Sequence, residues 1–573
     1  MLSHLALFAS LCVPATPSHS WFKVKEDNGV YWFSHPQYPK FWSFAADCID
    51  VGAPGKPDNP SYDGLKLFGT EKAWADDTMA KLKSWGLNSL GAWSDHDKFN
   101  KLIPDSKRIP YFVVLHLGAY DKAPWNDMYA PSGLKLMDDA AKKQIVPIKN
   151  DPMLVGFFTD NELGWWGDTL FPTYLNFDEK SPGKQRLVAM LREHYGNDFS
   201  WLKKDWKTNL DSFSALLKPC KLSLIPGQNG IQAVRKWVYT LSRHYYSTMR
   251  DLVRKYDQNH LILGDRYAQF FDLDVLNASK GLIDVNSTNL GSDWLDGTYS
   301  HFYLDTVYRV TKKPTVITEF YFAAMENETG NRNTGQAFPK VQTQVQRAKG
   351  FQQCLKEFAQ RPHVIGAHWF QFYDEPPKGR GDGEDWNMGL VDIYGKPYPL
   401  MIDVAKKAKS SQVHSKPKKA PSPAVPLAPS HPMADRLLNW NREVGYVPSP
   451  SLNQWGDLYV CHDESSLYVG LLSMEYFDES LYEGGRIPEV DRPRFKLSLN
   501  SKVFDFRFNG NKQKASALPA VELVEWPGLR PVIIAKIPLS SLNLKSKLVQ
   551  LEGSLWSHGR GRKMTWSRRL SLR

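Results

Sequence analysis

The feature that most constrains the fold is an alternation of short apolar runs and amphipathic stretches between residues 21 and 405. Helical periodicity is clearest at 71–85, 185–195 and 233–256. Eight short apolar runs, with helices between them, predict a (β/α)8 TIM barrel with enlarged loops. A doubly wound sheet is the alternative, but no G-x-G-x-x-G motif or P-loop accompanies the runs. The runs have the length of buried strands: 41–48, 88–93, 109–117, 154–160, 261–264, 283–287, 315–319 and 364–370.

We assign the barrel to residues 21–405. One segment of the chain precedes it and two follow it. Residues 1–20 combine an apolar run with small residues, as in a signal peptide, and predict a secreted or periplasmic protein. Residues 406–433 are rich in Lys, Pro and Ala and are expected to be a linker. Residues 434–573 contain short alternating strands, which indicate an antiparallel β-sandwich. No segment predicts a transmembrane helix, so we expect no membrane partner.

The net charge of +11 is compatible with solubility or with attraction to an anionic polysaccharide. Basic residues are spread along the chain and form no nucleic-acid motif, so we expect no nucleic-acid partner. The cysteines beyond the signal segment are far apart and show no zinc-binding spacing. We therefore expect no metal site. Free thiols are expected at Cys48, Cys220, Cys354 and Cys461, with one disulfide among them as the alternative.

Two glutamates are the candidate catalytic residues. Glu162 follows the fourth predicted strand, and Glu319 ends the seventh. Functional groups of a barrel lie at the carboxyl ends of its strands, so these side chains are expected to face each other across the mouth. Carboxylates about 5–5.5 Å apart are what retaining glycoside hydrolysis needs. Either glutamate alone would more simply pair with a buried arginine, but two at these positions predict glycoside hydrolysis without a cofactor.

The surroundings of the two glutamates suggest different roles. Glu162 is predicted to be the acid/base, its pKa raised by the second glutamate and by desolvation among Trp165 and Trp166. Glu319 is predicted to be the ionised nucleophile that attacks the anomeric carbon. Asn161 is expected to hydrogen-bond the 2-hydroxyl of the sugar, a contact that strengthens in the transition state.

The sequence around these residues resembles glycoside hydrolase family 50, the β-agarases, within the clan A retaining glycosidases. The resemblance covers about residues 30–405 and implies retaining cleavage of β-1,4-galactosidic bonds in agarose without a metal. One departure is the end of the sixth strand, NSTN, which lacks the His-x-Tyr of some clan families and leaves open what holds Glu319. The segments that carry the resemblance are NSLGAWSD (88–95), GFFTDNELGW (156–165), TEFYFAA (318–324) and NMGLVD (387–392).

Six further residues are candidate substrate contacts. The clan resemblance implies that Trp369, at the end of the eighth strand, forms an aromatic floor beneath the sugar; a core position is the alternative. His116 ends the third strand and either contacts sugar, orients Glu162 or is structural. For the other four, on presumed loops at the barrel mouth, substrate contact and loop packing both remain open: Asp95, Arg266, Tyr321 and Trp386.

The C-terminal segment weakly resembles a family 9-like carbohydrate-binding module, through WGDLYV (455–460) and SLYV (466–469). Its role is either glycan binding or packing, and Trp440, Trp455 and Trp526 are either stacking or core residues. The predicted function is thus that of a secreted retaining hydrolase whose partner is a polysaccharide, agarose or a related galactan. The alternatives are a clan A β-galactosidase or other β-glycanase, and a non-catalytic glycan-binding protein.

Overall fold

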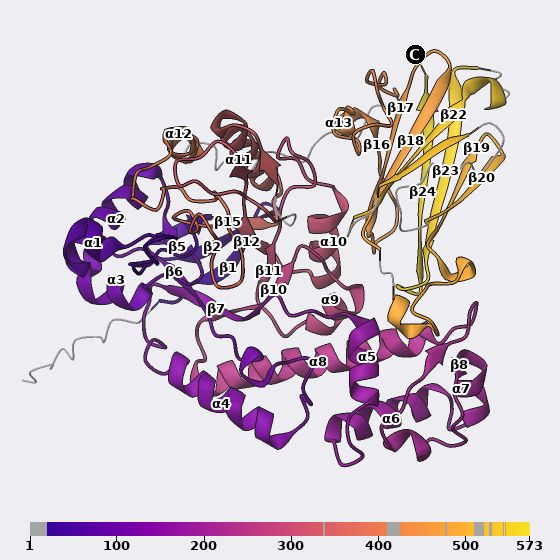
Figure 1. Cartoon of the computed structure of the whole chain (residues 1–573), viewed down its shortest axis with the longest axis horizontal. Helices are drawn as coiled ribbons and strands as arrows, with labels where there is room; N and C mark the ends of the chain where they lie inside the picture. Colours follow the sequence, from indigo (N-terminus) through magenta and orange to yellow (C-terminus); the bar gives the residue numbers. More distant parts are fainter. Residues whose placement is uncertain are drawn as a thin grey trace, which may run out of the picture.

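The computed structural model describes residues 20–335, 339–408, 424–475, 478–508, 521–526, 530–542, 544 and 546–572. Most of the expected signal peptide and much of the expected linker lie outside these residues. The described chain forms a closed barrel, with an antiparallel β-structure packed beside it (Figure 1). None of its helices is long and apolar enough to cross a membrane. Cys48, Cys220, Cys354 and Cys461 all carry free thiols.

Eight parallel strands close the barrel, and each overlaps one of the runs predicted from the sequence. The (β/α)8 fold is therefore confirmed. The strands are apolar on both faces because side chains fill the barrel interior and helices cover the outside. In order around the barrel they are β4 (Ser43–Ala46), β5 (Ser89–Leu90), β6 (Tyr111–Val114), β7 (Leu154–Asn161), β10 (Leu261–Ala268), β11 (Asn286–Asn289), β12 (Thr315–Phe320) and β15 (Val364–Trp369).

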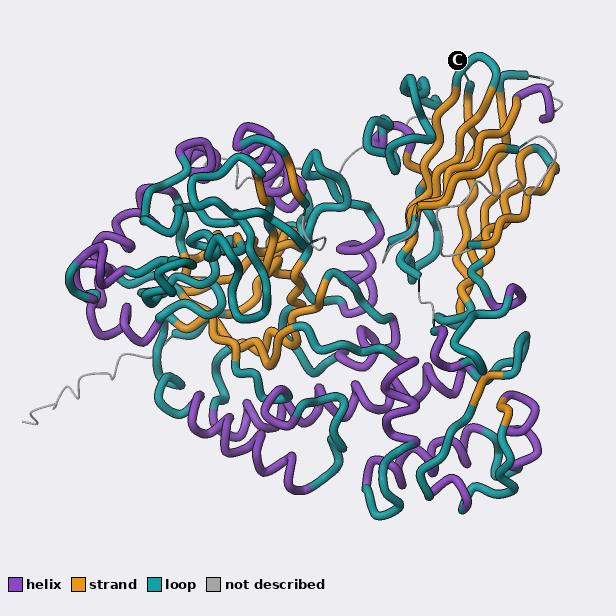
Figure 2. The backbone as a smooth tube through the Cα atoms, in the orientation of Figure 1, coloured by secondary structure: helices purple, strands orange, loops and turns teal. Residues whose placement is uncertain are grey.

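Helices surround the strands (Figure 2). The predicted helix at 71–85 begins at Thr70, whose side chain accepts a hydrogen bond from the Ala73 amide, and ends at Gly86, whose φ of 90° suits a residue without a Cβ. The helices that precede the sandwich are α1 (Gly64–Phe68), α2 (Glu71–Trp85), α3 (His96–Leu102), α4 (Pro131–Ile145), α5 (Gly167–Leu175), α6 (Pro182–His194), α7 (Phe199–Asp205), α8 (Ile231–Tyr256), α9 (Leu273–Ser279), α10 (Phe302–Thr311), α11 (Gln344–Ala359) and α12 (Pro399–Ala408), and a short helix, α13 (Arg442–Gly445), lies directly before β16.

A small antiparallel sheet that the sequence patterns did not predict closes the amino-terminal end of the barrel. It consists of β1 (Lys23–Asp27), β2 (Val30–His35) and β3 (Tyr38–Phe41). Phe33 of this sheet packs in one cluster with interior barrel residues such as Phe112 and Val316. The opposite end, where the strands terminate, is left for a functional site.

The C-terminal strands form two antiparallel sheets, which confirms the β-sandwich. Trp440 and Trp455 are buried in its core, so neither offers a free ring face for sugar stacking; Trp526 is half-buried. One sheet contains β16 (Tyr446–Val447), β17 (Gly456–His462), β18 (Ser466–Ser473), β22 (Val532–Pro538) and β21 (Glu522–Trp526). The other contains β20 (Lys502–Arg507), β19 (Arg494–Leu499), β23 (Leu548–Ser557) and β24 (Arg562–Ser571).

The sandwich packs against the side of the barrel near β11 and α10 (Figure 1). Trp294, in the loop after β11, packs edge-on against Tyr459 of β17, with 6.0 Å between ring centroids. The amide of His301 donates to the buried carboxylate of Asp457 at 2.5 Å. These contacts fix the sandwich close to the mouth of the barrel.

Candidate active site

The carboxyl ends of the barrel strands surround a pocket of about 970 Å³. Glu162 and Glu319 both line it, together with Asn161, Tyr321 and Trp93. The structure therefore brings the two candidate catalytic carboxylates into one cavity at the expected end of the barrel. Within the described residues, no cluster of three or more His, Cys, Asp or Glu side chains is arranged to hold a metal ion.

The turn that carries Glu162 is held by buried polar groups. Glu162 has a φ of 55°, an unfavourable value for a residue with a Cβ, and its amide donates to the carbonyl of Arg266 at 2.9 Å. Just before it, the buried carboxylate of Asp160 accepts hydrogen bonds from the amide of Gly118 at 2.9 Å and the hydroxyl of Tyr245 at 2.6 Å. These contacts stabilise a conformation that projects Glu162 into the pocket.

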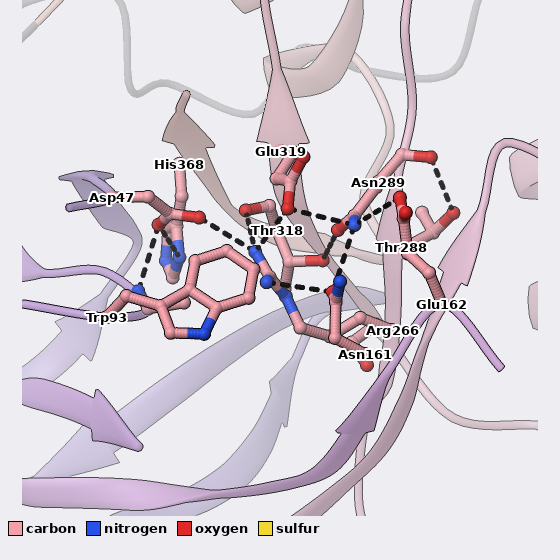
Figure 3. A network of polar contacts seen from close by, with 12 residues as sticks. Asp47, Trp93, Asn161, Glu162, Arg266, Thr288, Asn289, Thr318, Glu319 and His368 are labelled. Atoms are coloured by element: carbon pink, nitrogen blue, oxygen red, sulfur yellow. Dashed lines mark hydrogen bonds and ion pairs between the residues drawn. The ribbon is translucent and has the colours of Figure 1, made fainter. Parts of the chain in front are cut away.

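Asn289, the last residue of β11, connects the two glutamates (Figure 3). Its side-chain oxygen accepts from the hydroxyl of Thr318 at 2.7 Å, which fixes the orientation of the amide. Its Nδ2 then donates to Glu162 Oε1 at 2.8 Å and to Glu319 Oε1 at 3.0 Å. Because one nitrogen reaches both carboxylates, their Oε1 atoms lie within two hydrogen-bond lengths of each other.

Arg266 supplies the positive charge beneath the pocket. It is fully buried, and its Nη2 lies 2.7 Å from Asp47 Oδ2 and 3.2 Å from Glu319 Oε1. Its Nη1 donates to Asn161 Oδ1 at 2.9 Å, and its guanidinium lies 4.3 Å from the ring centroid of Trp93. One cation is therefore shared between two buried carboxylates.

Burial dominates the electrostatics of these carboxylates. It raises the pKa of Asp47 to about 7, although Arg266 opposes the shift. Burial likewise raises the pKa of Glu319 well above its usual value; Arg266 opposes this shift, and the carboxylates of Glu162 and Asp47 add to it. The ionisation of Glu319 thus depends on how strongly the guanidinium of Arg266 interacts with it and how strongly with Asp47.

The environment predicted for Glu162 is wrong for the free protein. Glu162 is exposed, whereas Glu319 is the buried member of the pair. Trp165 does not cover Glu162, because its indole nitrogen donates to the buried Asp265 at 3.2 Å and its ring packs on Tyr245. Of the two predicted tryptophans, only Trp166 lines the pocket.

The sequence relatives are β-agarases. No family model matches the chain. β-Agarase B of Vibrio sp. (strain JT0107) is 29% identical over 362 residues, which cover 59% of this chain and 36% of the relative. β-Agarase A of the same organism is 26% identical over 366 residues, with the same coverage of both chains. The chain thus spans about a third of the length of these relatives.

In sequence, this chain is similar to β-agarases. The similarity confirms the resemblance to family 50 indicated by the sequence motifs. Among solved structures, the fold resembles an exo-β-agarase (TM-score 0.59, 21% identity, 68% of this chain and 65% of the other). The agarase AgWH50C gives a TM-score of 0.58 at 22% identity, with the same coverage. PfGH50B gives 0.58 at 21% identity and covers 68% of this chain and 66% of its own.

The other predicted contacts are divided between the pocket, its surroundings and the core. Arg266 lies beneath the pocket, as described, and Tyr321 lines it, with its hydroxyl accepting from Gln269 Nε2 at 2.5 Å. His116 does not line the pocket but accepts from the indole nitrogen of Trp93 at 3.0 Å. It therefore supports a wall residue.

Three further predicted contacts also lie outside the pocket lining. Trp369 is fully buried, and its indole nitrogen donates to the carbonyl of Met388 at 2.7 Å, so it is a core residue and not a floor for the sugar. Trp386 is also buried, packed near Tyr321. Asp95 precedes α3 and pairs with Lys98 at 3.1 Å, which is a loop-packing role.

Sequence reasoning missed several residues in and around the pocket. Asn289 and Asp47 follow or end barrel strands, so the strand-end rule that selected the glutamates could also have found them. Neither of them lines the cavity; Asn289 contacts the two glutamates that do, and Asp47 pairs with Arg266 beneath it. Arg436 and Arg530 line the pocket but come from the C-terminal part of the chain. No local signal indicated those two arginines.

Proposed function

We propose that this chain is a retaining glycoside hydrolase that cleaves β-galactosidic bonds of agarose-type galactans through a covalent glycosyl-enzyme intermediate. The observation that carries the proposal is the amide of Asn289, which donates to both Glu162 and Glu319. The resulting proximity of the carboxylates suits direct attack by one of them, because an inverting enzyme needs a wider gap to accommodate water.

In the first step, Glu319 attacks the anomeric carbon while Glu162 gives its proton to the departing glycosidic oxygen. In the second, Glu162 takes a proton from water, the water oxygen bonds to the anomeric carbon, and Glu319 leaves as a carboxylate. Arg266 and Asn289 support this assignment, since the guanidinium of Arg266 forms an ion pair with Glu319 and the amide of Asn289 donates to it, and both favour its ionised form against the effect of burial.

Glu162 and Asn161 would act when sugar enters the pocket. Because Glu162 is exposed in the free protein, we expect the bound sugar to exclude water from this carboxyl. Asn161 Oδ1 accepts hydrogen bonds from Arg266 at 2.9 Å and from Asn289 at 3.2 Å. Its Nδ2 is thus the group available to donate to a sugar hydroxyl. The proposed chemistry uses side chains alone and needs no cofactor.

The substrate class comes from the β-agarases that the chain resembles. A polysaccharide substrate fits the predicted export through residues 1–20, which remains a proposal. Glycan binding by the sandwich is likewise a proposal, and the buried rings of Trp440 and Trp455 do not support stacking at those positions.

The test compares the wild-type protein with Glu162→Gln and Glu319→Gln on agarose, porphyran, carrageenan, β-mannan and β-glucan. Glu179→Gln is the matched control, because Glu179 is exposed and lies outside the pocket. We expect neoagaro-oligosaccharides from the wild type and the control, but not from the two pocket variants. Proton NMR of the first product should show retention of the anomeric configuration.

Each alternative predicts a different result. If the protein releases products from another glycan, and both glutamates are required, the mechanism stands but agarose is not the substrate. Inversion at the anomeric carbon would refute the covalent intermediate. Binding of a glycan without any hydrolysis would favour the non-catalytic binding protein.

A further inference from the structure

One wall of the pocket comes from the C-terminal part of the chain. Arg436 precedes β16 and Arg530 precedes β22, yet both line the cavity that contains Glu162 and Glu319. Arg530 is anchored to the barrel, because its Nη2 donates to the carbonyl of Gln269 at 2.7 Å. The indole nitrogen of Trp294 donates to the carbonyl of Arg436 at 2.8 Å and fixes the backbone of that residue.

Most charges that line this pocket already have a partner. Arg530 is ion-paired with Asp293. Arg380 is ion-paired with Asp382 and Glu384. Apart from Glu162 and Glu319, every acidic residue of the lining therefore has an arginine partner. These pairs leave little charge available to a ligand.

Arg436 differs from the other two pocket-lining arginines. Its Nη2 donates only to the backbone carbonyl of Arg530, at 3.0 Å, and its buried Nε has no hydrogen-bond partner. Among the described residues, no carboxylate lies within ion-pair distance of its guanidinium. Partial burial lowers the pKa of Arg436, yet an arginine stays protonated at neutral pH. A partly desolvated cation that makes no direct ion pair, and is stabilised only at longer range by the carboxylate that Arg530 already pairs with, Asp293, therefore lines the pocket.

We infer that Arg436 binds an anionic substituent of the glycan, a sulfate ester or a ring carboxylate, in the cavity that contains Glu162 and Glu319. Guanidinium N–H groups bind such oxygens through charge-assisted hydrogen bonds, which are stronger than those to a neutral hydroxyl. Arg530 keeps its bond to Asp293 and holds Arg436 in place through its own carbonyl. This inference rests on the proposed function, since it adds a charged group to the galactan proposed as substrate.

The experiment compares neutral agaro-oligosaccharides with sulfated porphyran oligosaccharides and with C6-carboxylated agaro-oligosaccharides. Arg436→Gln should lower kcat/KM on the preferred anionic oligosaccharide by roughly tenfold, with the neutral oligosaccharide changed less than about twofold. Whether the sulfated or the carboxylated oligosaccharide loses rate in this variant tells which anionic group Arg436 binds. Arg436→Lys, which keeps the charge, should retain much of the preference. Arg486→Gln removes a charge from an exposed site outside the pocket and should change neither rate.

Binding to the inactive Glu319→Gln variant separates this inference from the proposed function. In that background, calorimetry should show tighter binding of an anionic oligosaccharide, a preference that Arg436→Gln removes and that salt weakens. If the wild type cleaves no galactan, the proposed function fails while this measurement still tests the anion site. Equal affinities for neutral and anionic oligosaccharides, or equal losses for both in Arg436→Gln, would overturn the inference.

Discussion

Replacing Arg266 by methionine tests whether one buried cation stabilises the pocket by its charge. The change leaves two buried carboxylates, Asp47 and Glu319, without the guanidinium that lies 2.7 Å from one and 3.2 Å from the other. Removing one partner of a buried ion pair costs about 3–5 kcal/mol in the free energy of unfolding. At about 2.1 cal/mol/K of unfolding entropy per residue, this loss lowers the melting temperature of a barrel of this size by roughly 5 °C.

The sign of the pH dependence follows from proton linkage. The pKa of Asp47 is raised to about 7 in the folded protein, so this group favours the folded state most in acid and loses that contribution as the pH rises through 7. Without Arg266 the folded-state pKa values of Asp47 and Glu319 rise further. The stability difference between variant and wild type should therefore be small at pH 5, where Asp47 is neutral, and larger at pH 8, where it is ionised.

Calorimetric melting at pH 5 and pH 8 measures this difference. The double variant Arg266→Met/Asp47→Asn is the control, because it removes one of the uncompensated carboxylates and should recover part of the stability lost at pH 8. Equal losses at the two pH values would refute the electrostatic argument and show that Arg266 acts through packing.

Three other substitutions test separate parts of the structure. Asn289→Ala should lower kcat by roughly 10- to 100-fold, because hydrogen bonds to both carboxylates are lost; a change in KM alone would contradict this role. Asp47→Asn should shift the acidic limb of the kcat/KM profile to lower pH, because the carboxylate of Asp47 raises the pKa of Glu319; an unmoved limb would contradict the coupling. Trp294→Ala should lower the unfolding free energy by about 3–5 kcal/mol, since the ring is buried between barrel and sandwich; an unchanged melting temperature would argue against that packing.

The sequence was sufficient for the barrel because its strands are apolar on both faces and separated by helices. It did not reveal the sheet of β1–β3, whose last strand merges in sequence with the run assigned to the first barrel strand. At the site, strand-end position predicted Glu162 and Glu319. It did not predict the orientation of Trp369, because a doubly buried strand lacks the alternation that tells one face from the other.

The remaining site residues depend on tertiary structure. Arg266 was a candidate only as a loop residue, and its central position follows from how β10 lies between β7 and β11. Arg530 is 237 residues away from its partner Asp293, so no local pattern could bring it to the pocket. The exposure of Glu162 also could not be read from its aromatic neighbours, because Trp165 turns toward Asp265.

The wall contributed by Arg436 and Arg530 affects how modular this protein can be. A fragment that ended at the linker would keep both glutamates but lose part of the cavity around them, and it would uncover Trp294. The sandwich therefore cannot be exchanged for another ancillary domain as an independent unit. Substrate preference could instead change through mutations more than 60 residues beyond the last barrel strand, without any change in the barrel itself.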